Sequence, residues 1–78
     1  MELDTNHEIA LQHHSYKFEA GQLVRHIKSG RIYSVQRLCR IESNNSAAYA
    51  YIEHPIKISS VLWVRPATDM ESRFEAIS

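Results

Sequence analysis

Apolar and polar side chains alternate along much of the chain after residue 15, which is the pattern of β-strands with one covered face. Tyr16 and Phe18 alternate with polar and charged neighbours and lead to a turn at Gly21. The next apolar run predicts a strand over residues 23–27. This part of the chain therefore predicts a β-sheet rather than a set of helices.

The longest predicted strand covers residues 32–41 and follows a two-residue hairpin signal, Ser29-Gly30. Four apolar or aromatic positions share one of its faces: Tyr33, Val35, Cys39 and Ile41. Arg37 falls on the same face and interrupts it. Because a charged side chain does not fit in a continuous core, a β-bulge or an exposed edge is predicted near Arg37.

A polar turn over residues 43–46 leads to another predicted strand, over residues 47–53. Tyr49 and Tyr51 share one of its faces, and alanines occupy the other. Alanine side chains give little cover, so this face could accept another chain by close packing or by strand addition. The pattern therefore indicates a protein-binding adaptor or a homodimer.

A last strand is predicted over residues 58–65 and ends at Pro66, which lacks a backbone donor. Trp63 is the only tryptophan of the chain and is expected in the core. Thr68 and Glu71 fit a capping box for a short helical turn. Three side chains at helical spacing should pack this turn on the sheet: Met70, Phe74 and Ile77.

Residues 1–15 are expected to form either a short helix, for which Thr5 and Glu8 fit a capping box, or a flexible arm. Residues 16–78 are expected to form the folded domain. Closing four to five short strands on themselves hides the sheet edges, so a mainly β, small SH3-like antiparallel barrel with a short C-terminal helical turn is predicted. The alternative is an open α+β sheet covered by the N-terminal segment.

Composition adds limits. Seventy-eight residues allow one domain, and the formal net charge is zero. The longest apolar runs are a few residues and the N-terminus is acidic, so neither a membrane-spanning helix nor a signal peptide is expected, and no membrane partner. A single cysteine excludes an internal disulfide, which makes a reducing cytoplasmic location the expectation.

Catalytic and metal-binding patterns are missing from the sequence. None of the five histidines has the helical spacing of a zinc motif, and His13 and His14 are adjacent, so they would diverge on a strand. Cys39 has no partner motif, and there is no phosphate-binding or dinucleotide-binding loop. We therefore expect no enzyme activity, no metal and no cofactor.

Basic residues are concentrated between residues 21 and 40, where no carboxylate occurs. Cationic and aromatic side chains together bind single-stranded nucleic acid, because cations hold phosphates and rings stack on bases. The candidate contact residues for nucleic acid or another partner are Arg25, His26, Lys28, Arg31, Arg37, Arg40, Tyr33, Tyr49, Tyr51 and Arg65. The other interpretation is that these basic residues lie on a solvated strand face, where the acidic residues on either side of this segment neutralise them.

Two groups of residues have a spacing that can be compared with known families. The first is Gly21, Arg25, His26, Lys28, Gly30, Tyr33 and Val35. The second, after Tyr49 or Tyr51, is Trp63, Val64, Arg65, Pro66, Met70 and Phe74. With this spacing, about the last two thirds of the chain resemble a family of short bacterial and phage domains of unknown function. In addition, residues 18–24 are similar to the opening segment of small SH3-like barrels. Both resemblances imply a compact β-barrel module and neither supplies an activity.

We therefore expect a non-catalytic interaction module of bacterial, phage or prophage origin that binds a protein partner or a second copy of itself. The alternative is a nucleic-acid-binding accessory factor, for DNA replication or repair or in a phage-related role, that uses the basic strand face with its aromatic residues.

Overall fold

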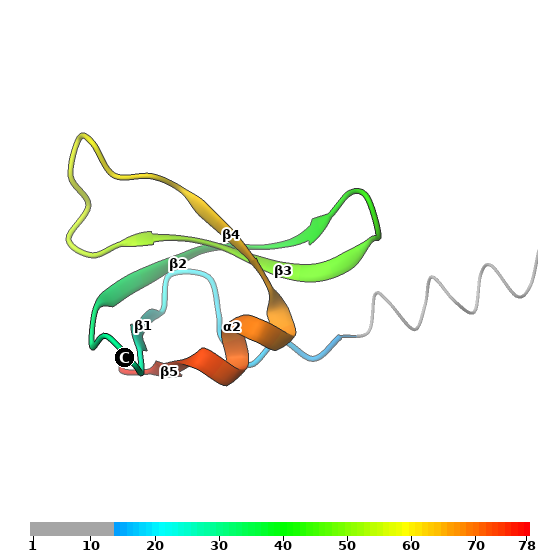
Figure 1. The fold of residues 1–78 in the computed structure, drawn as a ribbon, viewed down its shortest axis with the longest axis horizontal. Coiled ribbons are helices and arrows are strands. Elements are labelled where there is room, and N and C mark those ends of the chain that lie inside the picture. Colours follow the sequence, from blue (N-terminus) through cyan, green and yellow to red (C-terminus); the bar gives the residue numbers. More distant parts are fainter. Residues whose placement is uncertain (1–13) are drawn as a thin grey trace, which may run out of the picture.

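The computed structural model describes residues 14–78, which form five strands and one short helix (Figure 1). The elements in chain order are β1 (Leu23–His26), β2 (Ile32–Ile41), β3 (Ser46–Glu53), β4 (Trp63–Pro66), α2 (Ala67–Arg73) and β5 (Phe74–Ala76). The mainly β fold and the helical turn near the C-terminus are confirmed. The predicted N-terminal helix or arm lies almost wholly on residues 1–13, outside the described residues.

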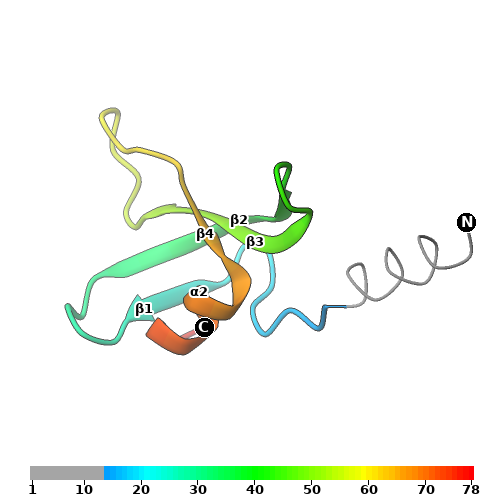
Figure 2. The same ribbon diagram turned by 45° about the vertical axis from the view of Figure 1, so that its right-hand side comes forward.

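All five strands pair antiparallel in one sheet, with the order β4-β3-β2-β1-β5 (Figures 1 and 2). The sheet is open: among residues 14–78, β4 and β5 are its two edges and do not pair with each other. α2 connects these edges directly and packs against β3, so a helix fills the space where a closing ladder would lie. The predicted closure into a barrel is therefore not observed, and in this respect the open-sheet alternative agrees better with the structure.

The predicted bulge in β2 is confirmed. The pairing of β2 with β3 shifts between Val35, which lies opposite Tyr51, and Arg37, which lies opposite Ala50. Directly paired residues of an antiparallel sheet share a face, so the shift turns Arg37 away from the tyrosine face that carries the core. One extra residue thus moves Arg37 off the tyrosine face, but Cys39 and Ile41 move with it, so they do not share the face of Tyr33 and Val35 as predicted.

The core lies between the tyrosine face of the sheet and α2. Its largest fully buried side chains are Tyr49, Phe18, Phe74, Met70, Val24 and Val35. The ring of Phe74 packs edge-on against Tyr51 at 5.5 Å and against Tyr33 at 5.7 Å between centroids. Aromatic packing from four separate segments therefore joins β5 and the residues before β1 to the central strands.

Trp63 is not in the core, contrary to the prediction, because 52% of its surface is exposed. It lies opposite Tyr51 at the end of β4 that is farther from α2. Phe74 takes the central position against Tyr51 instead. The indole is therefore left at the rim of the sheet.

Two further details of the C-terminal region differ from the prediction. The strand expected over residues 58–65 begins only at Trp63. The expected capping box does not form, because α2 is capped by Pro66 without a side-chain hydrogen bond. The carboxylate of Glu71 is engaged elsewhere, where it accepts a hydrogen bond from the backbone N–H of Lys17 at 2.9 Å.

Candidate functional site

The connection between β3 and β4, residues 54–62, rises away from α2 and β5 in both ribbon views (Figures 1 and 2). Of the nine large apolar side chains that are exposed among residues 14–78, six lie on this connection and on the start of β4. We call these six the apolar hairpin surface: Ile56, Ile58, Val61, Leu62, Trp63 and Val64. Trp63 and Val64 belong to the edge strand β4, and the other four residues precede it in the chain.

The connection has an internal framework of hydrogen bonds. The N–H of Ser60 donates to the carbonyl of Lys57 at 2.9 Å, and the N–H of Lys57 donates to the Ser60 hydroxyl at 2.8 Å. The same hydroxyl donates to the Glu53 carboxylate at 3.1 Å, which fastens the turn to the end of β3. The apolar side chains around this turn are thus presented on a defined backbone.

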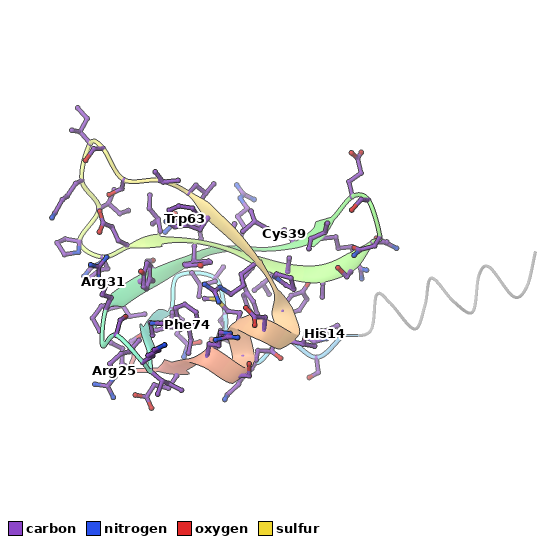
Figure 3. The ribbon with its side chains drawn as sticks, viewed as in Figure 1. His14, Arg25, Arg31, Cys39, Trp63 and Phe74 are labelled. Atoms are coloured by element: carbon purple, nitrogen blue, oxygen red, sulfur yellow. The ribbon has the colours of Figure 1, made fainter. Side chains whose placement is uncertain are left out.

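A hollow of about 380 Å³ lies beside the turn. Trp63, Tyr33 and Tyr51 line it with rings, and Arg31, Arg65 and Glu53 line it with charges. In the stick view, Arg31 lies near the start of β2 and Trp63 lies near the start of β4 (Figure 3). A hollow of this size is at the small end of the range of ligand pockets.

The two arginines of the hollow differ in their partners. Arg65 donates from Nε to the Tyr51 hydroxyl at 3.1 Å and from a terminal nitrogen to Asp69 at 2.8 Å. Burial alone would lower the pKa of Arg65, but these two partners raise it above its ordinary value. The guanidinium of Arg31, by contrast, has no hydrogen-bond or ion-pair partner in the described part of the chain.

The predicted basic residues do not form one patch. Arg25 pairs with Glu75, which lies directly opposite it on β5. Arg40 donates to the carbonyl of Asn45 at 3.0 Å. Arg37 lies on the face opposite to the core, and Lys28 lies in the turn between β1 and β2. Alternation along the strands and the bulge of β2 send these charges to different sides of the sheet.

The other predicted contact residues are mostly structural. Tyr49 is fully buried and Tyr51 is 5% exposed, because α2 and the rings of Phe18 and Phe74 pack on that face of β3. His26 accepts or donates through Nδ1 to the Ser29 hydroxyl at 2.7 Å and packs at 5.0 Å against Phe74. Of the predicted tyrosines, only Tyr33 is both partly exposed and close to Arg31 at the hollow.

The predicted alanine surface is not open to strand addition. β3 is an inner strand with β2 on one side and β4 on the other, so its backbone groups are already paired. Ala48 is fully buried and Ala50 is 6% exposed, next to Pro66 and Val64 of β4. The free edges belong to β4 and β5 instead.

A second polar cluster, around Glu71, holds the start of the described chain against α2. One carboxylate oxygen accepts hydrogen bonds from the Tyr49 hydroxyl at 2.5 Å and from the Lys17 N–H at 2.9 Å, and His14 Nε2 lies 3.3 Å away. Burial works to raise the pKa of Glu71, but the bonds from Tyr49 and Lys17 together with His14 outweigh it and lower the pKa. Because every partner is internal, we assign this cluster to stability.

Residues 14–78 contain no group of three or more histidine, cysteine, aspartate or glutamate side chains that could hold a metal ion. Burial raises the pKa of the Cys39 thiol, which disfavours the nucleophilic thiolate. No helix in the described segment is long and apolar enough to cross a bilayer.

Comparison with protein-family models, with curated proteins and with solved structures found no match. The resemblance to short bacterial and phage domains therefore stays a prediction. The function is inferred below from the geometry of the chain itself.

Proposed function

We propose that the chain is a non-catalytic interaction module that binds a segment of another protein along the free edge of β4. The observation that carries the proposal is the apolar hairpin surface next to an unpaired strand edge. Exposed apolar patches of this kind mark interaction sites, and an edge strand offers free backbone N–H and C=O groups to a partner strand. A partner strand would satisfy both features at once.

The surface is distributed in a way that favours a binding role over incidental exposure. Scattered apolar side chains are normal on a protein surface. Here Ile56 is 59% exposed, Leu62 56% and Val64 57%, all within a nine-residue stretch. Fully covering one such side chain contributes roughly 1.5–3 kcal/mol, so a partner that covers part of the surface gains appreciable affinity.

We also propose that the domain is an opened relative of the SH3-like barrels. Five antiparallel strands, a bulged long second strand and a helical turn before the last strand support this relationship. In this view α2 separates the two edge strands that a closed barrel would bring together. The open edge of β4 is what makes the binding mode available.

Nucleic-acid binding has weaker support. Arg25 and Arg40 already have internal partners, and Lys28, Arg31 and Arg37 do not share one face of the sheet. A phosphate backbone needs several cations along one path. Among residues 14–78, the hollow beside Trp63 offers one guanidinium without a partner, that of Arg31.

A displayed library of random peptides, selected against the whole 78-residue chain, tests the proposal. We expect enriched peptides rich in β-branched and aromatic residues. Their binding should shift the emission of Trp63 to shorter wavelength, because the indole loses its contact with water. Replacing Ile56 and Ile58 together with aspartate should weaken binding at least about tenfold, since charges replace apolar contacts.

The matched control is Ile27→Asp, because Ile27 is 57% exposed but lies in the turn between β1 and β2. This control should bind the selected peptides like the unmodified chain. The proposal fails if no peptide is enriched, or if Ile27→Asp weakens binding as much as the hairpin variant. Tight binding of single-stranded oligonucleotides that survives the hairpin substitutions would support the alternative function instead.

A further inference from the structure

We propose that the partner segment carries an aspartate or glutamate side chain that enters the hollow beside Trp63 and pairs with Arg31. This inference rests on the proposed function and names the chemistry that the site selects. The hollow contains one guanidinium that has no hydrogen-bond or ion-pair partner among residues 14–78.

Arg31 is that group. Its side chain is exposed, lines the hollow and has no partner among residues 14–78. Arg65, the other cation of the hollow, is already held by Tyr51 and Asp69. An unpaired guanidinium at the wall of a hollow forms its strongest interaction with a carboxylate, because two parallel N–H groups match the two oxygens.

Among residues 14–78, Glu53 is the only carboxylate that lines the hollow, and no ion pair joins it to Arg31. It accepts a hydrogen bond from the Ser60 hydroxyl at 3.1 Å, which holds it to the turn. Lys57, in the same connection, has an ammonium group without a partner in the described residues. Within the hollow, Arg31 is therefore a positive charge without an ion-pair partner among the described residues, and Glu53 is the one negative charge that lines the same space.

The aromatic rings of the hollow strengthen its preference for a carboxylate over an uncharged group. Trp63 and Tyr33 place rings beside Arg31, and a partner that covers these rings would exclude water and lower the local dielectric constant. A charge-assisted hydrogen bond is stronger in these surroundings than on an open surface. A carboxylate that follows an apolar residue of the partner would therefore be selected over an uncharged amide of the same shape.

The test uses peptides selected against the whole chain, synthesised with each Asp or Glu and again with Asn or Gln in its place. Titration is followed by the fluorescence of Trp63. We expect the selected peptides to contain an acidic residue whose amide version binds at least about tenfold more weakly. In Arg31→Gln, the acidic and amide peptides should bind equally and weakly. In Arg31→Glu, a peptide with lysine at that position should recover binding.

Lys28→Gln is the matched control, because Lys28 lies in the same turn region but does not line the hollow. It should retain the preference for the acidic peptide. The inference is overturned if the amide peptides bind as well as the acidic ones, or if Arg31→Gln keeps the preference. If the substitutions at Ile56 and Ile58 weaken peptide binding but replacing Asp or Glu of the peptide with the amide does not, the proposed function stands and only this inference fails. Binding to phosphatidylserine vesicles through Ile58, with no peptide enriched, would overturn both.

Discussion

Replacing Phe74 with alanine is expected to lower the free energy of unfolding by about 3–5 kcal/mol. Phe74 is 2% exposed, and its ring contacts Tyr33, Tyr51 and His26 at centroid distances of 5.7, 5.5 and 5.0 Å. Removing it leaves a cavity where β5 meets the central strands. A domain of this size has a small total stability, so the variant should be largely unfolded without a stabilising partner. Urea denaturation followed by circular dichroism measures the change.

The control for this prediction is Ile77→Ala. Ile77 is 42% exposed, so its loss should cost well under half as much. A conservative change, Phe74→Leu, should fall between the two because it restores part of the volume. If Phe74→Ala proves as mild as Ile77→Ala, the aromatic core is assigned to the wrong residues.

The second large effect is expected at Glu71. Replacing it with alanine should cost roughly 2–3 kcal/mol, because the Tyr49 hydroxyl and the Lys17 N–H lose a charged acceptor. The Glu71 side chain is 19% exposed, so water replaces it only in part. Tyr49→Phe removes the same bond from the other side. The double variant should therefore lose clearly less than the sum of the two single losses.

The same cluster makes stability depend on pH. The pKa of Glu71 in the folded chain lies below its ordinary value of 4.5. Its contribution is therefore present above pH 4.5 and is lost as the pH falls through the lower, folded pKa. In Glu71→Gln this part of the acid-induced loss should disappear. Asp69→Asn is the control, because it removes a different carboxylate with a lowered pKa and leaves the Glu71 dependence in place. Equal pH profiles for Glu71→Gln and the unmodified chain would contradict the assignment.

The local features of the fold could be predicted because they depend on neighbouring residues. The extent of β2 and the bulge before Arg37 follow from strand alternation, and Gly30 has the positive φ of 76° that its turn requires. What alternation cannot tell is which face is covered at each point. That depends on α2 and β5, which come last in the chain. For this reason Trp63 was wrongly predicted in the core, and a closed barrel was predicted instead of an open sheet.

The candidate site was predicted only in part. Four residues that were named as contact candidates do line the hollow: Arg31, Tyr33, Tyr51 and Arg65. They were grouped, however, with cations that pairing and the bulge direct elsewhere. The apolar hairpin surface was missed because residues 58–62 resemble the start of a buried strand. The two serines at positions 59 and 60 were the available signal, since Ser60 closes the turn that keeps these residues out of the sheet.

The central claim, that β4 is the edge at which a partner is bound, is tested most directly by amide hydrogen exchange. The exchange of single backbone N–H groups is compared with and without a saturating selected peptide. We expect slower exchange at amides of Trp63, Val64 or Arg65 that face away from β3, and at neighbouring amides of the connection. The β5 edge, Phe74–Ala76, serves as the internal control and should not change. Protection at β5 instead of β4, or at neither edge, would contradict the account.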